Sequence, residues 1–211
     1  MKDIPIFETP YGVASLMLKE IPYRGTAYIQ VQSMSGDDPT ALLSECATFC
    51  RMAGADKVYS NVGRGEPDSV MLRMVGCAWV DKEKLENLFP VTEATVERWR
   101  KLYNEKMASL PHAATLTAAD EKRILETGGA YFVHHEGELL GIGWLEDTKL
   151  LAIAAVKPGA GERVAHTLMS MVEGADMTIE VLSTNERAIR LYERLGFLKT
   201  GEVLRWYAVK K

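Results

Sequence analysis

The sequence has little of several residue types that would identify its class at once. It has three cysteines, an odd number too small for a disulfide framework, and four histidines without the spacing of a metal site. No stretch approaches the roughly 18 apolar residues of a membrane-spanning helix. The formal net charge of −4 shows no excess of basic residues. These absences argue against a disulfide-stapled secreted protein, a metal centre, a membrane protein and a nucleic-acid-binding protein.

What remains is the composition of an ordinary globular protein. Of the 211 residues, 47% are hydrophobic and 26% charged, enough for one large or two small domains. Cys46 and Cys50 stand four residues apart, so they share one helix face and suit buried thiols. The segment Met1–Pro5 contains no apolar stretch typical of a secretion signal. We therefore expect a cytoplasmic protein without metal.

The most informative segment lies near the C-terminus. Met177–Leu182 is rich in β-branched and apolar residues, which predicts a short buried strand. Ser183 and Glu186 fit a capping box, so the following helix is expected to begin just after Ser183. Gly196 suits the left-handed residue that ends a helix. The helix carries Tyr192 beside its apolar face.

This segment resembles a known signature. Residues 185–197 match N-x-x-A-x-x-L-Y-x-x-x-G-F at every fixed position, which is the C-terminal pattern of the GCN5-related N-acetyltransferases (GNAT superfamily). The resemblance implies an α/β acyl-CoA N-acyltransferase fold, in which a central mixed, mostly antiparallel sheet is flanked by helices. It also implies acetyl-CoA as co-substrate and a primary amine as acceptor.

Hydrophobic periodicity gives an element order that agrees with this fold. Residues 86–211 are expected to form the acetyltransferase domain. Its expected elements, in chain order, are helices over 95–107 and 117–125, strands over 130–135, 139–145 and 150–156, a helix over 162–173, the strand and helix described above, and a final strand pair over 198–201 and 203–209.

Residues 1–85 are expected to form a separate α/β unit. Strands are predicted over 11–19, 26–32 and 57–62, with a helix over 40–52. The sequence Gly-Ala-Asp, which ends a predicted helix before a strand, occurs at 54–56 and again at 174–176. The unit is therefore either a degenerate GNAT-like repeat or an unrelated appendage. Ser60 takes the position of Glu180 and no Leu-Tyr pair follows, so chemistry is expected only in the C-terminal unit.

The resemblance also nominates residues for acetyl-CoA. The backbone of Ala154 and Val156 would pair with the pantetheine arm, and Asn185 would lie near it. The loop and helix start after this strand would hold the pyrophosphate, through Gly159, Gly161, Arg163, Val164 and Ala165, with Lys157 as a second cation. The family's Q/R-x-x-G-x-G/A run is not reproduced, because Ala160 and Arg163 replace its first two fixed residues and only Ala165 conforms.

Acetyl transfer to an amine requires a proton to leave the amine and another to reach the departing thiolate. The resemblance makes Tyr192 the general acid. Glu180 is the candidate base, directly or through water, and Glu146 is a second candidate. His112, in a loop that lines the acceptor site in this fold, is either a substrate contact or an exposed loop residue.

Two functions are compatible with these residues. The first is an acetyl-CoA-dependent N-acetyltransferase that acts on a primary amine of a small molecule or peptide by direct attack. The second is a non-catalytic GNAT-fold protein that binds acyl-CoA or a protein partner, as the altered phosphate loop suggests. We expect no nucleic-acid or membrane partner, and the sequence leaves the oligomeric state open.

Overall fold

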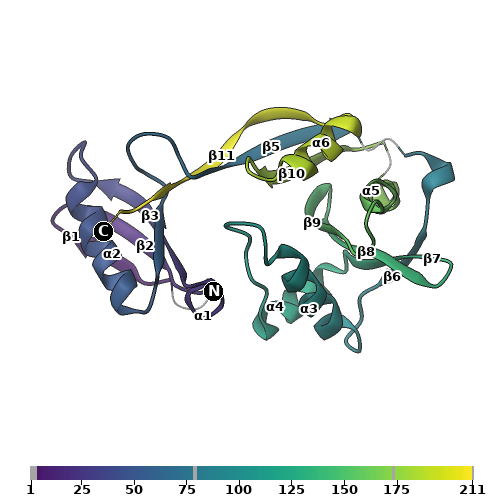
Figure 1. Ribbon diagram of the computed structural model, residues 1–211, viewed down its shortest axis with the longest axis horizontal. Helices are drawn as coiled ribbons and strands as arrows, with labels where there is room; N and C mark the ends of the chain where they lie inside the picture. The colour runs from purple at the N-terminus through teal and green to yellow at the C-terminus, as the bar shows by residue number, and fades with distance from the viewer. Residues whose placement is uncertain (1–3, 78–79, 173, 211) are drawn as a thin grey trace. The chain divides into compact units, whose positions relative to one another are not determined.

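A computed structural model describes residues 4–77, 80–172 and 174–210. The chain forms two compact units, one of Met1–Met71 with Glu202–Lys211 and one of Leu72–Gly201 (Figure 1). The expected boundary between residues 85 and 86 lies inside the second unit. Strands β5 (Ser69–Cys77) and β11 (Leu198–Ala208) contribute residues to both units.

The first unit contains a sheet covered by one long helix. Its strands are β1 (Ile6–Thr9), β2 (Gly12–Met17), β3 (Thr26–Met34) and β4 (Lys57–Ser60), followed in strand order by β11, and its helices are α1 (Ile21–Arg24) and α2 (Thr40–Met52). Cys46 and Cys50 lie on the buried face of α2, as predicted. Burial raises the pKa of both thiols to about 11, so they are poor nucleophiles at neutral pH.

The second unit has the strand order β5-β10-β9-β8-β7-β6. Its elements are β6 (Asn87–Pro90), α3 (Val96–Met107), α4 (Ala118–Thr127), β7 (Ala130–His135), β8 (Glu138–Glu146), β9 (Lys149–Ala155), α5 (Gly161–Met169), β10 (Asp176–Leu182) and α6 (Glu186–Arg194), with short 3-10 turns at Lys82–Lys84 and Ser170–Val172. The expected final strand pair is wrong, because β11 runs unbroken through Gly201 and Glu202. The expected helix over 162–173 ends at Met169, and residue 173 lies outside the described residues.

Two local features fix the start of a helix and the turn of a hairpin in this unit. Thr117 and Asp120 form a reciprocal capping box at the start of α4, as their spacing indicates. Glu136 and Gly137 both have positive φ values, 48° and 86°, which is the backbone of a tight hairpin turn between β7 and β8.

Each face of the second unit's sheet packs against its own pair of helices (Figure 1). On one face, α5 and α6 enclose a core with Leu168, Ile179, Val181 and Tyr192. On the other face, α3 and α4 pack on β7, β8 and β9 around Trp99 and other buried side chains. The fold class is therefore the expected mixed α/β sheet flanked by helices.

The two units repeat one topology. In each, two antiparallel strands lead to a helix and then to a strand parallel to the second of them: β2, β3, α2 and β4 in the first unit, and β8, β9, α5 and β10 in the second. Gly54 and Gly174 precede the parallel strands with positive φ values of 99° and 81°. This correspondence supports the repeat interpretation over an unrelated appendage.

Each unit is completed by a strand from the other half of the sequence. In the first unit, Tyr207 and Ala208 of β11 pair antiparallel with Ser60 and Tyr59 of β4. In the second unit, β5 follows β10 in the strand order. The sequence did not indicate β5 as a strand.

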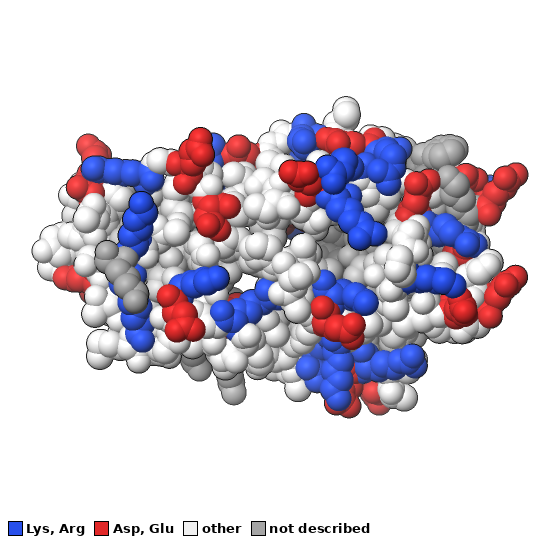
Figure 2. All heavy atoms as spheres, viewed as in Figure 1, with Lys and Arg blue, Asp and Glu red and all other residues white. Residues whose placement is uncertain are grey.

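Charge on the surface is mixed. Lys and Arg side chains alternate with Asp and Glu over the face drawn in Figure 2, in keeping with the net charge of −4. Across the part of the chain that the structure describes, no helix combines the length and apolarity needed to cross a membrane.

Close packing of α5 on β8 depends on two glycines. A Cβ atom added to Gly143 would lie 2.1 Å from Leu168 Cδ1, and one added to Gly141 would lie 2.6 Å from the Ala154 carbonyl oxygen and 2.7 Å from Val164 Cγ2. A side chain at either position would push the helix away from the strand. The glycines therefore fix where α5 begins relative to the end of β9.

The first prediction concerns this contact. Gly143→Ala should lower the free energy of unfolding by about 1–3 kcal/mol, because the new methyl group overlaps Leu168. The measurement is urea unfolding. Gly201→Ala is the matched control, since its Cβ would meet nothing within 4 Å, and it should change stability little. Equal stability of the two variants would contradict the close packing.

Candidate functional site

The parallel strands β9 and β10 are paired only at their beginnings. Lys149 pairs with Thr178 and Leu150 with Ile179, and no later pair joins the two strands, all of whose residues are described. At the same point β9 carries a β-bulge, because Trp144 pairs with Ala152 and Leu145 with Leu150, which leaves Leu151 unpaired. A bulge bends its strand. The two strands therefore separate toward their carboxyl ends.

The open edge of β9 belongs to Ile153 and Ala155. The Val156 amide donates to the Leu140 carbonyl oxygen at 2.8 Å, and the Ala154 carbonyl points at Gly141, so both residues direct their backbone toward β8. Backbone groups of successive strand residues point to opposite sides. The backbone groups of Ala154 and Val156, the residues expected to contact pantetheine, therefore pair with β8, and those of Ile153 and Ala155 face the open edge.

The loop after β9 leads directly into the N-terminus of α5. Gly159 has a φ of 82°, in the left-handed region that glycine favours, and the side chain of Ala160 is buried in the core. The first helical bond runs from the Val164 amide to the Ala160 oxygen at 2.9 Å. The amides of Gly161 and Arg163 precede it and have no intrahelical acceptor, so this end of α5 carries partial positive charge. Val164 and Ala165 are buried and serve packing.

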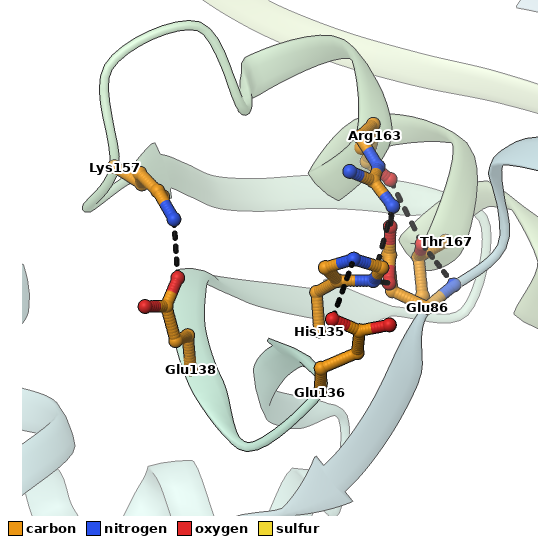
Figure 3. A network of polar contacts seen from close by, with 7 residues as sticks. All are labelled: Glu86, His135, Glu136, Glu138, Lys157, Arg163 and Thr167. Carbon is orange, nitrogen blue, oxygen red and sulfur yellow. Dashed lines mark hydrogen bonds and ion pairs between the residues drawn. The ribbon is translucent and has the colours of Figure 1, made fainter.

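The side chain of Arg163 is held by a carboxylate of its own chain (Figure 3). Its guanidinium forms an ion pair with Glu86, whose side chain is only 3% exposed, and contacts His135 Nδ1 at 3.1 Å. His135 Nδ1 also lies 2.9 Å from Glu86 Oε2. The backbone amide of Glu86 donates to Thr167 Oγ1 at 3.1 Å, which fixes the carboxylate beside α5.

The other expected cation of this loop is also paired. The Lys157 ammonium contacts the Glu138 carboxylate on the β7–β8 hairpin (Figure 3). Both basic side chains near the helix N-terminus thus have internal acidic partners. Sequence reasoning missed Glu86, which ends the charge-rich segment 81–86 that leads from the turn at Lys82–Lys84 into β6. This segment lies against α5, with Glu86 turned inward.

Helix α6 begins two residues later than its predicted cap. Asn185, not Ser183, is the N-cap residue, and its Oδ1 accepts the Ala188 amide at 3.2 Å. The side-chain oxygen of Asn185 therefore satisfies a donor of its own helix. Gly196 ends the helix region with a φ of 88°, as predicted.

Tyr192 is a residue of α6, and its side chain points into the core and is 5% exposed. Its ring contacts Phe197 with centroids 6.2 Å apart. It belongs to the same cluster as Ile153 and Ala155, the two residues on the open edge of β9. Burial raises the pKa of its phenol above the ordinary tyrosine value. Tyr192 therefore stays protonated throughout the neutral range.

Glu180 lies on the other face of β10. Its neighbours Ile179 and Val181 pack in the core with Tyr192, so strand alternation turns Glu180 away from it. Glu180 Oε1 accepts ion pairs from Lys149 Nζ at 3.0 Å and from Arg73 at 3.6 Å. The structure therefore does not bring the two expected catalytic side chains into contact.

The remaining candidates are also placed by the structure. Glu146, at the end of β8, forms an ion pair with Arg123 at 3.3 Å. His112 is half-buried in the loop between α3 and α4 and has a φ of 57°, an uncommon value for a residue with a side chain. Among the described residues, no hydrogen bond or ion pair joins either of them to Tyr192.

No protein-family model matches the sequence, and comparison with curated proteins finds no match. Solved structures do match. A conserved protein of unknown function from Staphylococcus epidermidis gives a TM-score of 0.62 at 10% identity, over 98% of this chain and 94% of that one.

Several of the matching structures are acetyltransferases, among them these two. A GCN5-related N-acetyltransferase from Sphaerobacter thermophilus gives 0.53 at 9% identity, over 93% and 75%. A GNAT-family acetyltransferase from Colwellia psychrerythraea gives 0.51 at 12%, over 97% and 84%. The chain has the GNAT fold.

The second prediction tests the buried ion pair. Arg163→Gln should lower the free energy of unfolding by about 1–3 kcal/mol, because it leaves the buried Glu86 carboxylate without its cation. Lys157→Gln, which breaks a mostly exposed pair, should cost no more than about 1 kcal/mol. Urea unfolding of both variants measures the difference. Equal losses of stability would show that burial of Glu86 does not make its ion pair with Arg163 more important than the exposed pair of Lys157.

Proposed function

We propose that this chain is an acetyl-CoA-dependent N-acetyltransferase that transfers an acetyl group to a primary amine. The observation that carries the proposal is the separation of β9 from β10 after Leu150 and Ile179. It leaves the backbone of Ile153 and Ala155 facing an open edge, and an extended pantetheine arm with its amide groups can pair there as an added strand does. Free thiols at Cys46, Cys50 and Cys77 suit a reducing, cytoplasmic compartment.

The pyrophosphate of the co-substrate would lie at the N-terminus of α5. The backbone amides at Gly161 and Arg163 and the helix dipole offer donors and positive potential, and Gly159 allows close approach of the backbone. Arg163 and Lys157 would add charge only by loosening their contacts with Glu86 and Glu138. Binding would therefore depend mainly on the backbone.

Tyr192 would act as the general acid. The thiolate of CoA must gain a proton as it leaves, and a phenol with a raised pKa reliably carries one at neutral pH. An ordinary phenol has a pKa of about 10 and a thiol about 8.5, so the transfer is uphill and the gain comes from positioning. Such an acid contributes on the order of 10²–10⁴-fold.

Proton removal from the amine is assigned to Glu180. Its carboxylate is three-quarters buried, on the face of β10 opposite Tyr192. An acceptor that approached from this face would meet the carboxylate before the thioester. Water bound to Glu180, or Glu146 at the end of β8, would be the alternative base.

One observation favours a second candidate function, a non-catalytic acyl-CoA-binding protein. Both cations near the phosphate site have internal carboxylate partners, and Glu86 is buried with its own. A protein that kept the fold but lost phosphate binding would have no selection against such pairs. Acetyl-CoA binding without turnover would support this alternative.

The third prediction separates binding from its absence. Calorimetric titration with acetyl-CoA should give a one-site isotherm with a dissociation constant of about 1–100 μM, roughly −8 to −5 kcal/mol. CoA without its acetyl group should bind similarly, because the backbone contacts are shared. No heat at saturating acetyl-CoA would contradict the enzyme proposal.

The fourth prediction concerns Tyr192. Tyr192→Phe should lower kcat by about 10²–10⁴-fold and keep acetyl-CoA affinity, because only the proton donor is lost. The wild-type kcat should rise with pH as the amine loses its proton. The kcat should show no decrease at any pH up to ~10, because the raised pKa keeps the Tyr192 phenol protonated over this whole range. Full activity of the variant in a thiol-release assay would exclude Tyr192 as the acid.

A further inference from the structure

We infer that the acceptor is a free, zwitterionic amino acid, whose ammonium binds Glu180 and whose carboxylate binds Arg73 and Lys149. This inference rests on the proposed acetyltransferase function and specifies its substrate class. It derives from a cluster of three charged side chains at the point where β9 and β10 separate.

The cluster has an uneven geometry. Lys149 Nζ and the Arg73 guanidinium both contact Oε1 of Glu180, at 3.0 and 3.6 Å. Across residues 4–77, 80–172 and 174–210, Glu180 Oε2 has neither a hydrogen bond nor an ion pair. One carboxylate oxygen is therefore available to an ammonium group while the other is held by two cations.

The two cations have donors to spare. A guanidinium and an ammonium together carry many more N–H donors than one carboxylate oxygen accepts. The Arg73 and Lys149 side chains remain 51% and 41% exposed, while Glu180 is 25% exposed. The cluster carries one net positive charge. It is thus complementary to a carboxylate in addition to an ammonium.

Its position suits an acceptor. Glu180 directly follows Ile179, the last residue of β10 that pairs with β9, and Lys149 pairs with Thr178 beside it. The cluster therefore lies at the start of the opening in which the thioester is proposed to sit. Its side chains occupy the face opposite the core that holds Tyr192. An amine held by Glu180 would approach the thioester from that face.

The charges discriminate among amines. A simple alkylamine or polyamine offers no carboxylate and meets two cations, which repel it. The N-terminus of a peptide carries its α-carboxyl as an amide, so it forfeits the contacts with Arg73 and Lys149. A free amino acid satisfies both ends of the cluster, through charge-assisted hydrogen bonds.

The test uses the full chain with acetyl-CoA and a panel of α-amino acids, each paired with its carboxamide and its decarboxylated amine. Thiol release should show kcat/KM at least about tenfold higher for the amino acid than for either partner. Arg73→Gln and Lys149→Gln should raise KM for the amino acid about tenfold to a hundredfold and leave KM for the carboxamide nearly unchanged.

Matched controls come from exposed ion pairs elsewhere. Arg205, 53% exposed and paired with Glu202, and Lys199, 49% exposed and paired with Glu193, resemble Arg73 and Lys149 in exposure. Arg205→Gln and Lys199→Gln should leave the preference for amino acids intact. Thermal melting of all four variants would verify that they fold.

Several outcomes would overturn the inference. They are equal rates for amino acids and their carboxamides, reaction only of amines that lack a carboxylate, and loss of both substrates to the same degree in the Arg73 and Lys149 variants. These failures are distinguishable from failure of the enzyme proposal. If calorimetry shows acetyl-CoA binding but the enzyme does not discriminate among amines, only the amino-acid inference is contradicted. If acetyl-CoA does not bind, both this inference and the acetyltransferase proposal are contradicted.

Discussion

The second unit depends on the pairing of the parallel strands β9 and β10, which are hydrogen-bonded at their beginnings and separate toward their carboxyl ends. Leu150 and Ile179 form the last pair, and the bulge at Leu151 redirects β9 immediately afterwards. Unpaired strand edges are costly inside a protein unless another group pairs with them. The opening therefore has a clear chemical requirement, an extended ligand with alternating donors and acceptors. Gly141 and Gly143 of β8 allow α5 to pack closely, which places its N-terminus at the end of the same opening. The unpaired strand edge and the helix N-terminus can therefore contact the same ligand.

The cations near this opening each have an acidic partner in the same chain. Cations near the start of α5 are paired with Glu86 and Glu138, and the cations beside β10 share Glu180. Beside α5, Glu86 is buried, so a phosphate that approaches Arg163 competes with a carboxylate that cannot easily reach water. Beside β10, the Glu180 side chain is more exposed than that of Glu86, and its two cations keep donors for further contacts. Pairing with buried Glu86 thus limits what Arg163 can bind, whereas pairing with Glu180 leaves Arg73 and Lys149 with donors for another anion.

Sequence reasoning succeeded where a local pattern carries its own physics. Gly196, the start of α4 near Thr117 and the apolar face of α6 were all predicted, because each depends on neighbours in the chain. Errors arose where the outcome depends on distant partners. Asn185 displaced Ser183 as the cap, and the pairing of β9 with β8 decided which amides face the opening. Glu86 and β5 were missed, since their roles come from contacts with α5 and β10.

The strand that closes the first unit has a consequence for synthesis. Residues of β4 pair with Tyr207 and Ala208, which follow about 150 positions later and leave the ribosome only after the whole second unit has been translated. The first unit therefore cannot complete its sheet before the second unit has been translated, and until then one edge of β4 is exposed. Such an edge invites pairing with other chains. Pairing of β11 with β4 thus removes an exposed strand edge late in the folding of this chain.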